Sequence, residues 1–337
     1  MAAGLPTTPR LPAIALSSFT NSPTHSVSLT TKMQDFRIDP DLLRRFAGRT
    51  VIVTGAANGI GAVVASRFND HGAKVVVSDL ASFEETAETL IKAFSRPEQA
   101  VSVAADVIDW QQMKMLFHRT VQRFGEVDIV IANAGVMESR PIMDLDDLDE
   151  NGNLKESIEG FRVIDINLKG TLNALRLAMH HMKNKSKPSG SLVLLASTSG
   201  YFGGTGVAAY VASKHGIVGL LRATQNTAQQ YGIRVNAVAP SFTTTRLTAG
   251  SAQRWHEAGL ESKTPQRVAE FIEQVALDPT RAGSCVLVAG KYLREMEMEF
   301  TRTRMLAPWL GEDVARFMAS AMQFFQDIGG YVLPKSA

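Results

Sequence analysis

From residue 49 onward, short runs of apolar residues alternate with longer stretches in which apolar positions recur at helical spacing. The expected strands read VIVTG, AKVVVSDL, AVSVAADV, VDIVIANAG, SLVLLAS, RVNAVAP and CVLVAG. The expected helices cover residues 60–71, 83–95, 110–124, 158–183, 207–230 and 264–277. Apolar strands of this kind are buried on both faces, and their alternation with helices indicates right-handed crossovers. The pattern therefore predicts an α/β fold with a doubly wound parallel sheet of about seven strands and helices on both faces.

Two extensions flank this alternating region. Residues 1–34 contain no Asp or Glu, are rich in Ser, Thr and Pro, and lack the periodicity of a packed element. We expect them to be disordered or to serve as an organellar targeting segment, and translation could also start at Met33. No internal repeat or long linker interrupts residues 35–290, which are therefore expected to form a single domain.

The carboxy-terminal extension, residues 291–337, contains one amphipathic stretch, GEDVARFMASAMQFFQD. Its apolar residues recur at helical spacing: Val314, Phe317, Met318, Ala321, Met322 and Phe325. A helix of this kind normally buries its apolar face. Three partners stay open, namely the body of the same subunit, the substrate site beneath a lid, and a second subunit.

Composition and charge narrow the class of protein. The chain of 337 residues is 45% apolar and carries a formal net charge of +2 without a long basic run, which argues against nucleic-acid binding. The single cysteine, Cys285, cannot form an internal disulfide or a metal cluster, which fits a reducing compartment. No apolar run reaches the ~18 residues of a membrane span. We therefore expect a cytoplasmic protein that holds no metal and contacts no membrane.

Three glycines follow the first expected strand, in the sequence VIVTGAANGIG. Gly55, Gly59 and Gly61 lie where this strand turns into the first helix. Glycine there permits a tight turn and lets the backbone approach a pyrophosphate at the amino end of the helix. An ordinary turn could have the same composition, but the place after the first strand of a βαβ unit predicts a dinucleotide site.

A carboxylate ends the second expected strand. Asp79 closes VVVSD, 18 residues after Gly61. An acid at this place accepts hydrogen bonds from the adenosine ribose and repels a 2′-phosphate, so it favours NAD over NADP. Neither Asn58 in the turn nor Leu80 after the acid offers the positive charge that a 2′-phosphate requires. The alternative is that Asp79 only caps the next helix.

Several motifs in a fixed order resemble the short-chain dehydrogenase/reductase family, in its short single-domain form. The turn matches the family's TGxxxGxG spacing with Thr54 and the three glycines. Further matches are AADV (Asp106, Val107), ANAG (Asn133, Ala134, Gly135), INLKG (Asn167), ASTSG (Ser197) and YVASK (Tyr210, Lys214). The motifs span residues 49 to about 290. The resemblance implies a Rossmann-like fold, an NAD(P) cofactor and hydride transfer between an alcohol and a ketone.

The resemblance also implies the cofactor contacts. The expected cofactor-binding residues are Thr54, Gly55, Asn58, Gly59, Ile60, Gly61, Asp79, Asp106, Val107, Asn133, Ala134, Gly135, Tyr210, Lys214, Pro240, Thr243 and Thr245. Asp106 and Val107 lie where the family contacts adenine. The chain departs from the family at Ser241, where the usual Pro-Gly becomes Pro-Ser, which could change the course of the nicotinamide loop. A milder change is Ala132 in place of the first Asn of NNAG.

The expected chemistry explains the catalytic residue types. Tyr210 and Lys214 lie four residues apart on one expected helix, and hence on the same face. A phenol can move the proton of a substrate hydroxyl only if its pKa of roughly 10 falls, and the Lys214 ammonium with the cationic nicotinamide favours the phenolate. Ser197 ends a strand, and its hydroxyl can orient the substrate oxygen. Asn167 is assigned by the resemblance alone, as the holder of a water that links the lysine to solvent.

An acidic insertion, MDLDDLDENGNL, separates ANAG from INLKG. Its spacing from Asp147 imitates a calcium-binding EF-hand loop, but the twelfth position is Ile158, where a bidentate Glu is required. A solvated turn beside the substrate mouth is the better interpretation.

The substrate and the partners follow less directly. Residues 136–141, 198–207 and 242–260 are expected to form the substrate wall, whose few charges suit a moderately large, mainly apolar alcohol or ketone. By resemblance, the helices at 158–183 and 207–230 make the subunit contacts of a homodimer or homotetramer. The tail with PWLGED resembles fungal members of the family, many of which act in secondary metabolism.

The sequence thus predicts an NAD-dependent oxidoreductase with Tyr210 as general acid or base. An NADPH-dependent ketoreductase is the alternative within the family, and Asp79 argues against it. A dinucleotide-binding scaffold without turnover is the alternative outside it, and the complete set of catalytic residue types argues against that. A sugar-nucleotide epimerase would require a different glycine spacing and a larger substrate domain.

Overall fold

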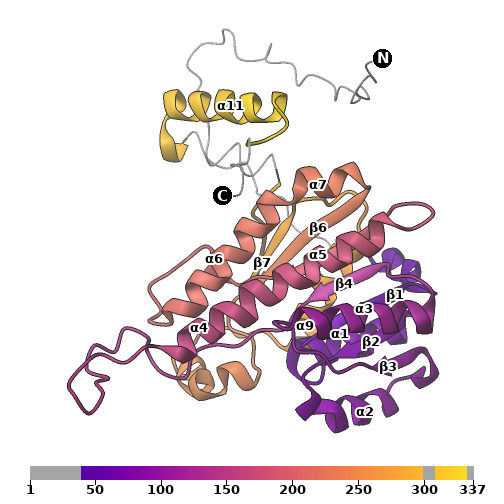
Figure 1. The fold of residues 1–337 in the computed structure, drawn as a ribbon, viewed down its shortest axis with the longest axis horizontal. Helices are drawn as coiled ribbons and strands as arrows, with labels where there is room; N and C mark the ends of the chain where they lie inside the picture. Colours follow the sequence, from indigo (N-terminus) through magenta and orange to yellow (C-terminus); the bar gives the residue numbers. More distant parts are fainter. Residues whose placement is uncertain (1–38, 299–307, 332–337) are drawn as a thin grey trace. The chain divides into compact units, whose positions relative to one another are not determined.

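The computed structural model describes residues 39–298 and 308–331, which belong to one compact unit (Figure 1). The expected amino-terminal extension, residues 1–34, lies outside the described residues. Among the helices that the structure describes, none is long and apolar enough to cross a membrane.

Eight strands form one sheet, in the order β3-β2-β1-β4-β5-β6-β7-β8. The strands are β1 (Thr50–Thr54), β2 (Lys74–Ser78), β3 (Ala100–Ser102), β4 (Ile129–Ala132), β5 (Gly190–Leu195), β6 (Ile233–Pro240), β7 (Cys285–Ala289) and β8 (Tyr292–Glu295). The first seven pair in parallel. The strand order reverses at β1 and β4, and sheets of this kind bind ligands beyond the carboxyl ends of the strands at such a reversal. The predicted doubly wound fold is confirmed.

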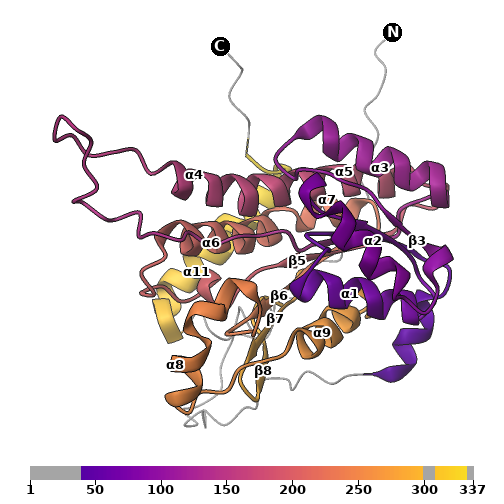
Figure 2. The same ribbon diagram turned by 90° about the horizontal axis from the view of Figure 1, so that it is seen from below.

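Helices cover both faces of the sheet. Val51 and Val53 of β1 join an apolar cluster with α1 (Gly59–Asp70), α2 (Glu84–Lys92) and α9 (Pro265–Leu277). Ile52, between them, joins a second cluster with α3 (Trp110–Phe124), α5 (Gly170–Lys183), α6 (Ala208–Ala223) and α7 (Gln225–Gln230). Figure 2 shows α3 and α5 on one side of the sheet and α1 and α9 on the other. Because successive strand residues face opposite helical layers, the strands are apolar at nearly every position.

The remaining helical segments are short. They are η2 (Pro40–Phe46), η3 (Ala81–Phe83), η4 (Pro97–Gln99), α4 (Ile158–Ile164), η5 (Asp165–Lys169), η6 (Thr198–Gly200), η7 (Arg246–Ser251) and α8 (Ala252–Glu257). The helix expected over residues 158–183 therefore consists of α4, the π-helical turn η5 and α5. The helix expected over 207–230 is divided at Thr224 into α6 and α7.

The sheet has one strand more than the sequence predicted. β8 pairs antiparallel with β7 at the edge, with Tyr292 opposite Ala289. The two-residue connection contains Gly290 at a φ of +49°, a left-handed conformation that suits a tight hairpin. The sequence pattern ended at β7 because β8 is short and mixes charged with apolar residues.

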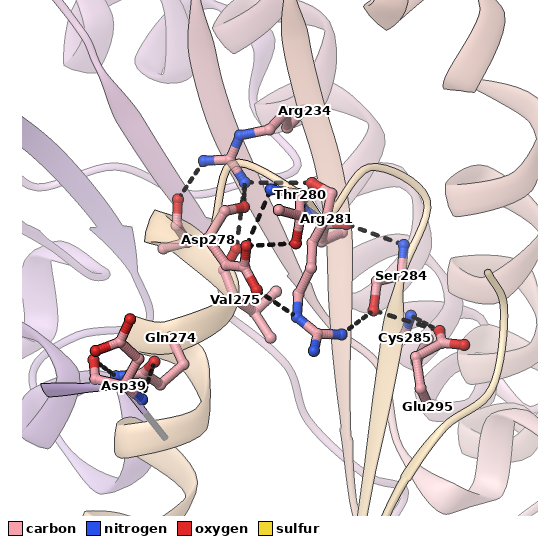
Figure 3. Close-up of polar contacts among 12 residues, drawn as sticks. Asp39, Arg234, Gln274, Val275, Asp278, Thr280, Arg281, Ser284, Cys285 and Glu295 are labelled. Atoms are coloured by element: carbon pink, nitrogen blue, oxygen red, sulfur yellow. Dashed lines mark hydrogen bonds and ion pairs between the residues drawn. The ribbon is translucent and has the colours of Figure 1, made fainter. Parts of the chain in front are cut away.

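Buried polar contacts tie the end of α9 to β6 (Figure 3). The Arg234 guanidinium donates to the backbone carbonyls of Val275, Ala276 and Asp278, at 3.4, 2.5 and 2.7 Å. The last carbonyl groups of a helix have no partner within the helix, so Arg234 satisfies groups that burial would otherwise leave unpaired. The contacts fix the base of β6, the strand that leads to Pro240.

Two segments stand out because several of their apolar side chains are exposed. Residues 140–157, which carry the acidic insertion, form an arm between β4 and α4, closed by an antiparallel bridge between Leu148 and Leu154. Asp149 accepts hydrogen bonds from the backbone of Asn151 and Asn153 within this arm, each at 2.9 Å.

The amphipathic helix of the tail is α11 (Glu312–Asp327). The rest of the described chain leaves its apolar face largely uncovered, with Phe317 70% exposed.

Candidate active site

The three glycines of the turn between β1 and α1 have different tasks. Gly55 and Gly59 have φ angles of +64° and +60°, which other residues rarely adopt. A Cβ on Gly55 would lie 2.7 Å from the Cα of Ala134, and one on Gly61 would lie 2.3 Å from the carbonyl oxygen of Gly55. A Cβ on Gly59 would meet no atom nearer than 3.9 Å, at Thr245. Gly55 and Gly61 thus let the turn pack against the end of β4, and Gly59 leaves space beside the turn.

Thr54 and Asn133 join the ends of β1 and β4. The Thr54 hydroxyl accepts from the backbone N–H groups of Asn133 and Ala134, at 3.1 and 3.2 Å. The Asn133 side chain donates to the carbonyls of Thr54 and Gly55, both at 2.9 Å. Two motifs that lie about eighty residues apart in the sequence therefore form one hydrogen-bonded unit at the point where the strand order reverses.

A cavity of about 300 Å³ lies beyond the carboxyl ends of β1, β2 and β4. The predicted cofactor residues that line it are Gly55, Asn58, Gly59, Ile60, Asp79, Asp106, Val107, Asn133, Ala134, Gly135 and Thr245. Thr54 and Gly61 do not line the cavity but support the turn that does. Most of the predicted cofactor residues thus line this cavity.

Asp79 lies at the end of β2, next to the glycine turn. One carboxylate oxygen accepts from the backbone N–H of Ala57 and the other from that of Leu80, each at 2.9 Å. Asp106 lines the same cavity, and its carboxylate accepts from the backbone of Ile108 at 3.1 Å. Backbone amides therefore hold both carboxylates in place.

A smaller cavity of about 90 Å³ adjoins the first. Its lining adds five predicted residues that do not line the larger cavity: Ser197, Tyr210, Lys214, Pro240 and Thr243. Both cavities share the wall residues Ile60, Asn133, Gly135, Leu195, Thr245 and Leu247. Lys214 is the one charged residue among the described residues that line the smaller cavity.

Ser197 and Tyr210 meet in the smaller cavity. Ser197 follows β5, donates to the carbonyl of Pro240 at 3.4 Å and accepts from the backbone N–H of Ser199 at 3.1 Å. Tyr210 lies in the first turn of α6 and forms a hydrogen bond with the Ser197 hydroxyl. Burial raises the pKa of Tyr210, the Ser197 hydrogen bond lowers it, and the charge of Glu138 raises it further.

Lys214 lies one turn after Tyr210 on α6 and is buried. Its ammonium donates to the carbonyl of Leu195 at 2.7 Å and lies 5.5 Å from the centroid of the Tyr210 ring. Burial lowers the pKa of Lys214 to about 8, so the side chain is still mostly a cation at neutral pH.

Asn167 lies within the π-helical turn η5 and is fully buried. Its amide nitrogen donates to the Val136 carbonyl and the Ser213 hydroxyl, both at 2.9 Å, and its amide oxygen accepts from the Val136 N–H at 2.8 Å. The side chain thus fixes the loop after β4 against α6. Its expected part in a water relay stays a prediction.

The loop after β6 keeps both predicted threonines at the cavities. Ser241, which replaces the family's usual glycine, donates its backbone N–H to the carbonyl of Val288 in β7 at 2.8 Å. Thr243 is buried against this turn, and Thr245 begins η7 through a reciprocal capping pair with Thr248. The Pro-Ser departure is therefore accommodated by extending the pairing of β6 with β7.

The sequence motifs did not single out two charged residues of the site, although one of them, Glu138, falls in the stretch 136–141 that was expected to form part of the substrate wall. Arg162 of α4 lines the larger cavity beside Arg246, and Glu138 bonds to the start of α6. Neither belongs to a motif, and the acidic insertion lies between them. No spacing rule could therefore have brought them to the site.

Comparison with known proteins settles the family. The model of the family described as short chain dehydrogenase matches residues 49–255. The short-chain dehydrogenase/reductase prx4 of Penicillium roqueforti is 32% identical over 298 residues, with 83% of this chain and 85% of that protein covered. The cis-4-hydroxycyclohexanecarboxylate dehydrogenase of Sinomonas cyclohexanicum is 34% identical over 257 residues, with 73% and 97% covered. The solved structure of levodione reductase has a TM-score of 0.65 and 25% identity, and 73% of this chain and 98% of that chain are covered.

These matches define a class and then a family. A Rossmann-like sheet with adjoining cavities at its strand reversal is the architecture of a dinucleotide-dependent enzyme. The chain belongs to the short-chain dehydrogenase/reductase family, and its relatives include a fungal one. The predicted enzyme class is confirmed: the protein is an oxidoreductase acting on CH–OH groups, in a family that uses NAD(P).

Proposed function

We propose that the chain is an NAD-dependent oxidoreductase that interconverts a secondary alcohol and its ketone, with Tyr210 as general acid or base. The observation that carries this proposal is the smaller cavity, where Ser197, Tyr210 and Lys214 lie together. Its walls are shared with the larger cavity, as transfer between a cofactor and a substrate requires. We place the protein in the cytoplasm and propose that it acts without metal, nucleic acid or membrane.

The residues around the larger cavity fit a dinucleotide. Gly59 leaves space beside the turn, and the side chain of Asn58 makes no capping hydrogen bond to α1. The first N–H groups of this helix are therefore left for a phosphate. Asp79 offers carboxylate oxygens to the hydroxyls of a ribose and repels a 2′-phosphate, which favours NAD over NADP.

The chemistry follows from three side chains. In the direction of oxidation, the Tyr210 phenolate takes the proton of the substrate hydroxyl while the carbon–oxygen bond becomes a carbonyl. The bound nicotinamide supplies the acceptor of the hydride. The Ser197 hydroxyl orients the substrate oxygen, and the Lys214 cation, 5.5 Å from the centroid of the Tyr210 ring, favours the phenolate by its charge. Reduction of a ketone runs through the same groups in reverse.

The substrate we propose is a moderately large, mainly apolar alcohol or ketone. Apart from Lys214, the described residues that line the smaller cavity carry no charge, which disfavours a phosphate or a carboxylate next to the reacting carbon. The Sinomonas relative is named for a hydroxyl on a cyclohexane ring. This name supports an alicyclic substrate. Because the tail resembles fungal members of the family, we propose a role in secondary metabolism.

An NADPH-dependent ketoreductase is the second candidate. Arg162 and Arg246 both line the larger cavity and could meet a 2′-phosphate. Asp79 is the opposing observation. A dinucleotide-binding scaffold without turnover would need no acid or base at Tyr210.

Substitution of Tyr210 tests the proposed function. We expect Tyr210→Phe to lower NAD reduction in the presence of alicyclic secondary alcohols by about 10² to 10⁴ fold, because the proton acceptor is lost. NADH affinity, followed by protein fluorescence, should be unchanged. The control is Tyr292→Phe on the exposed edge strand β8, which should behave as the wild type. Full turnover by Tyr210→Phe would refute the role, and failure of the wild type to bind either nucleotide would refute the proposal.

A further inference from the structure

Glu138 is a buried carboxylate beside Tyr210 that the chemistry above does not use. It lies in the loop between β4 and α4 and is 6% exposed. One carboxylate oxygen accepts from the backbone N–H of Ala209, and the other accepts from that of Tyr210, each at 3.0 Å. No ion pair among the described residues includes Glu138. A buried charge without a counter-ion is costly, so its presence calls for an explanation.

The two N–H groups belong to the first turn of α6, which supplies no cap of its own. The residue before the helix is Val207, and the first turn contains no acidic residue. The first N–H groups of a helix have no partner within it, and negative charge is stabilised at that end. By contrast, α3 and α9 are capped by Asp109 and Thr264 from their own sequence. Glu138 therefore caps the one turn that carries the reacting phenol.

The loop that carries Glu138 is held on both sides. Asn167 accepts from the Val136 N–H at 2.8 Å, two residues before the carboxylate. Glu159 of α4 accepts from the Ser139 N–H and hydroxyl at 2.5 and 3.1 Å, one residue after it. Hydrogen bonds on both sides of Glu138 thus hold its loop in place, and one of them comes from the predicted catalytic residue Asn167.

We propose that Glu138 is a positioning residue for the reaction at Tyr210: its carboxylate closes the first turn of α6 and places a fixed negative charge beside the phenol. The inference rests on the proposed function, in which Tyr210 moves the proton. Without the carboxylate, the turn that holds the phenol is left uncapped. The phenol also loses a neighbour that disfavours its ionised form.

The charges around Tyr210 decide whether the loss of Glu138 raises or lowers the pKa of the phenol. Burial raises the pKa of Tyr210 most, the Ser197 hydrogen bond lowers it, and the negative charge of Glu138 raises it. Lys214 faces the phenol from α6. The charged side chains on α4 and η5, which pack against α6, are Glu159, Arg162, Asp165 and Lys169. Neutralising Glu138 removes a like charge and therefore lowers the pKa of Tyr210.

The first experiment follows the ionisation of Tyr210 in the full chain loaded with NAD. The ultraviolet absorbance of tyrosinate is recorded against pH, and subtracting the same titration of Tyr210→Phe isolates one phenol. We expect Glu138→Gln to move the ionisation of Tyr210 to lower pH, because a like charge is removed. The matched control, Glu159→Gln, removes a carboxylate that bonds to the same loop without facing the phenol, and it should leave the titration unchanged. An unshifted titration in Glu138→Gln would overturn the proposal.

A second variant separates charge from placement and serves if Glu138→Gln does not fold. Glu138→Asp keeps the charge but shortens the reach to the helix. Its titration should match the wild type, while kcat falls several-fold and the KM for NAD stays the same. Wild-type kcat in this variant would contradict the positioning role. The tyrosinate signal needs no turnover, so the titration of Tyr210 tests the role of Glu138 even if the wild type is inactive. An inactive wild type would refute the proposed function alone.

Discussion

Asp79 presents its carboxylate to the larger cavity while both of its oxygens accept from backbone amides. Each carboxylate oxygen has a second lone pair, so the group can still accept hydrogen bonds from ribose hydroxyls. A 2′-phosphate at the same place would bring negative charge against a fixed carboxylate. We therefore expect Asp79 to favour NAD, whereas the guanidinium groups of Arg162 and Arg246, which line the same cavity, would favour NADP.

The wild type should bind NADH at least about tenfold more tightly than NADPH, a difference of about 1.4 kcal/mol. Asp79→Ser should reduce this ratio because the repulsion is lost, whereas Asp106→Asn, which neutralises the other carboxylate that lines the cavity, should retain it. Titrations followed by protein fluorescence give the six dissociation constants, two for each protein. A wild type that prefers NADPH would show that Arg162 or Arg246 outweighs the carboxylate, and reduction of ketones would become the activity to assay.

The residues that the sequence could predict are those whose partners belong to the same motif or to a neighbouring strand end. Tyr210 and Lys214 share a helix face, and Ser197 lies at the end of the strand beside it. Glu138 could not be predicted, because its partners are backbone N–H groups 71 and 72 positions away. Nearly every residue has the same backbone N–H group, so the sequence does not show which of these groups a side chain will contact. Such a contact is seen only in the folded chain.

At the scale of elements, apolar runs located the seven parallel strands and most helix bounds, because each element is covered on a face that its own sequence reveals. The apolar pattern did not predict that residues 158–183 are divided into α4, η5 and α5. The π-helical turn there places Asn167 against Val136 and Ser213, contacts that depend on neighbouring elements. The short edge strand β8 was not predicted for a similar reason, because it depends on β7 for its pairing.

The cap on α9 makes a testable contribution to stability. Arg234→Met should lower the free energy of unfolding by about 2 to 4 kcal/mol, because several carbonyl groups at the end of α9 lose a charged donor. Arg267→Met is the control: Arg267 is an exposed residue of α9 that pairs with Glu270, and its loss should cost less than about 1 kcal/mol. Urea unfolding measures both. Equal midpoints for the two variants would show that the Arg234 contacts add little.

At the scale of the whole molecule, apolar side chains remain uncovered on α4 and α5 and on the arm before them. Ile158 and Phe161 are 74% and 61% exposed, and Leu172 on α5 is also exposed. Exposed apolar residues that gather on adjoining elements mark an interaction site. They lie in the helices that the family resemblance assigns to subunit contacts, which supports our proposal of a homodimer or homotetramer. The apolar face of α11 is the competing contact surface.

Sedimentation of three variants distinguishes these surfaces. We expect the wild type to sediment as a dimer or tetramer at micromolar concentration and Phe161→Asp to dissociate, because a charge is placed where an apolar surface must be buried. Met115→Asp, on the exposed face of α3, should not change the mass. Dissociation by Phe317→Asp instead would assign the subunit contact to α11. A wild type that stays monomeric at every concentration would refute the oligomer and leave the exposed side chains of α4 to another partner.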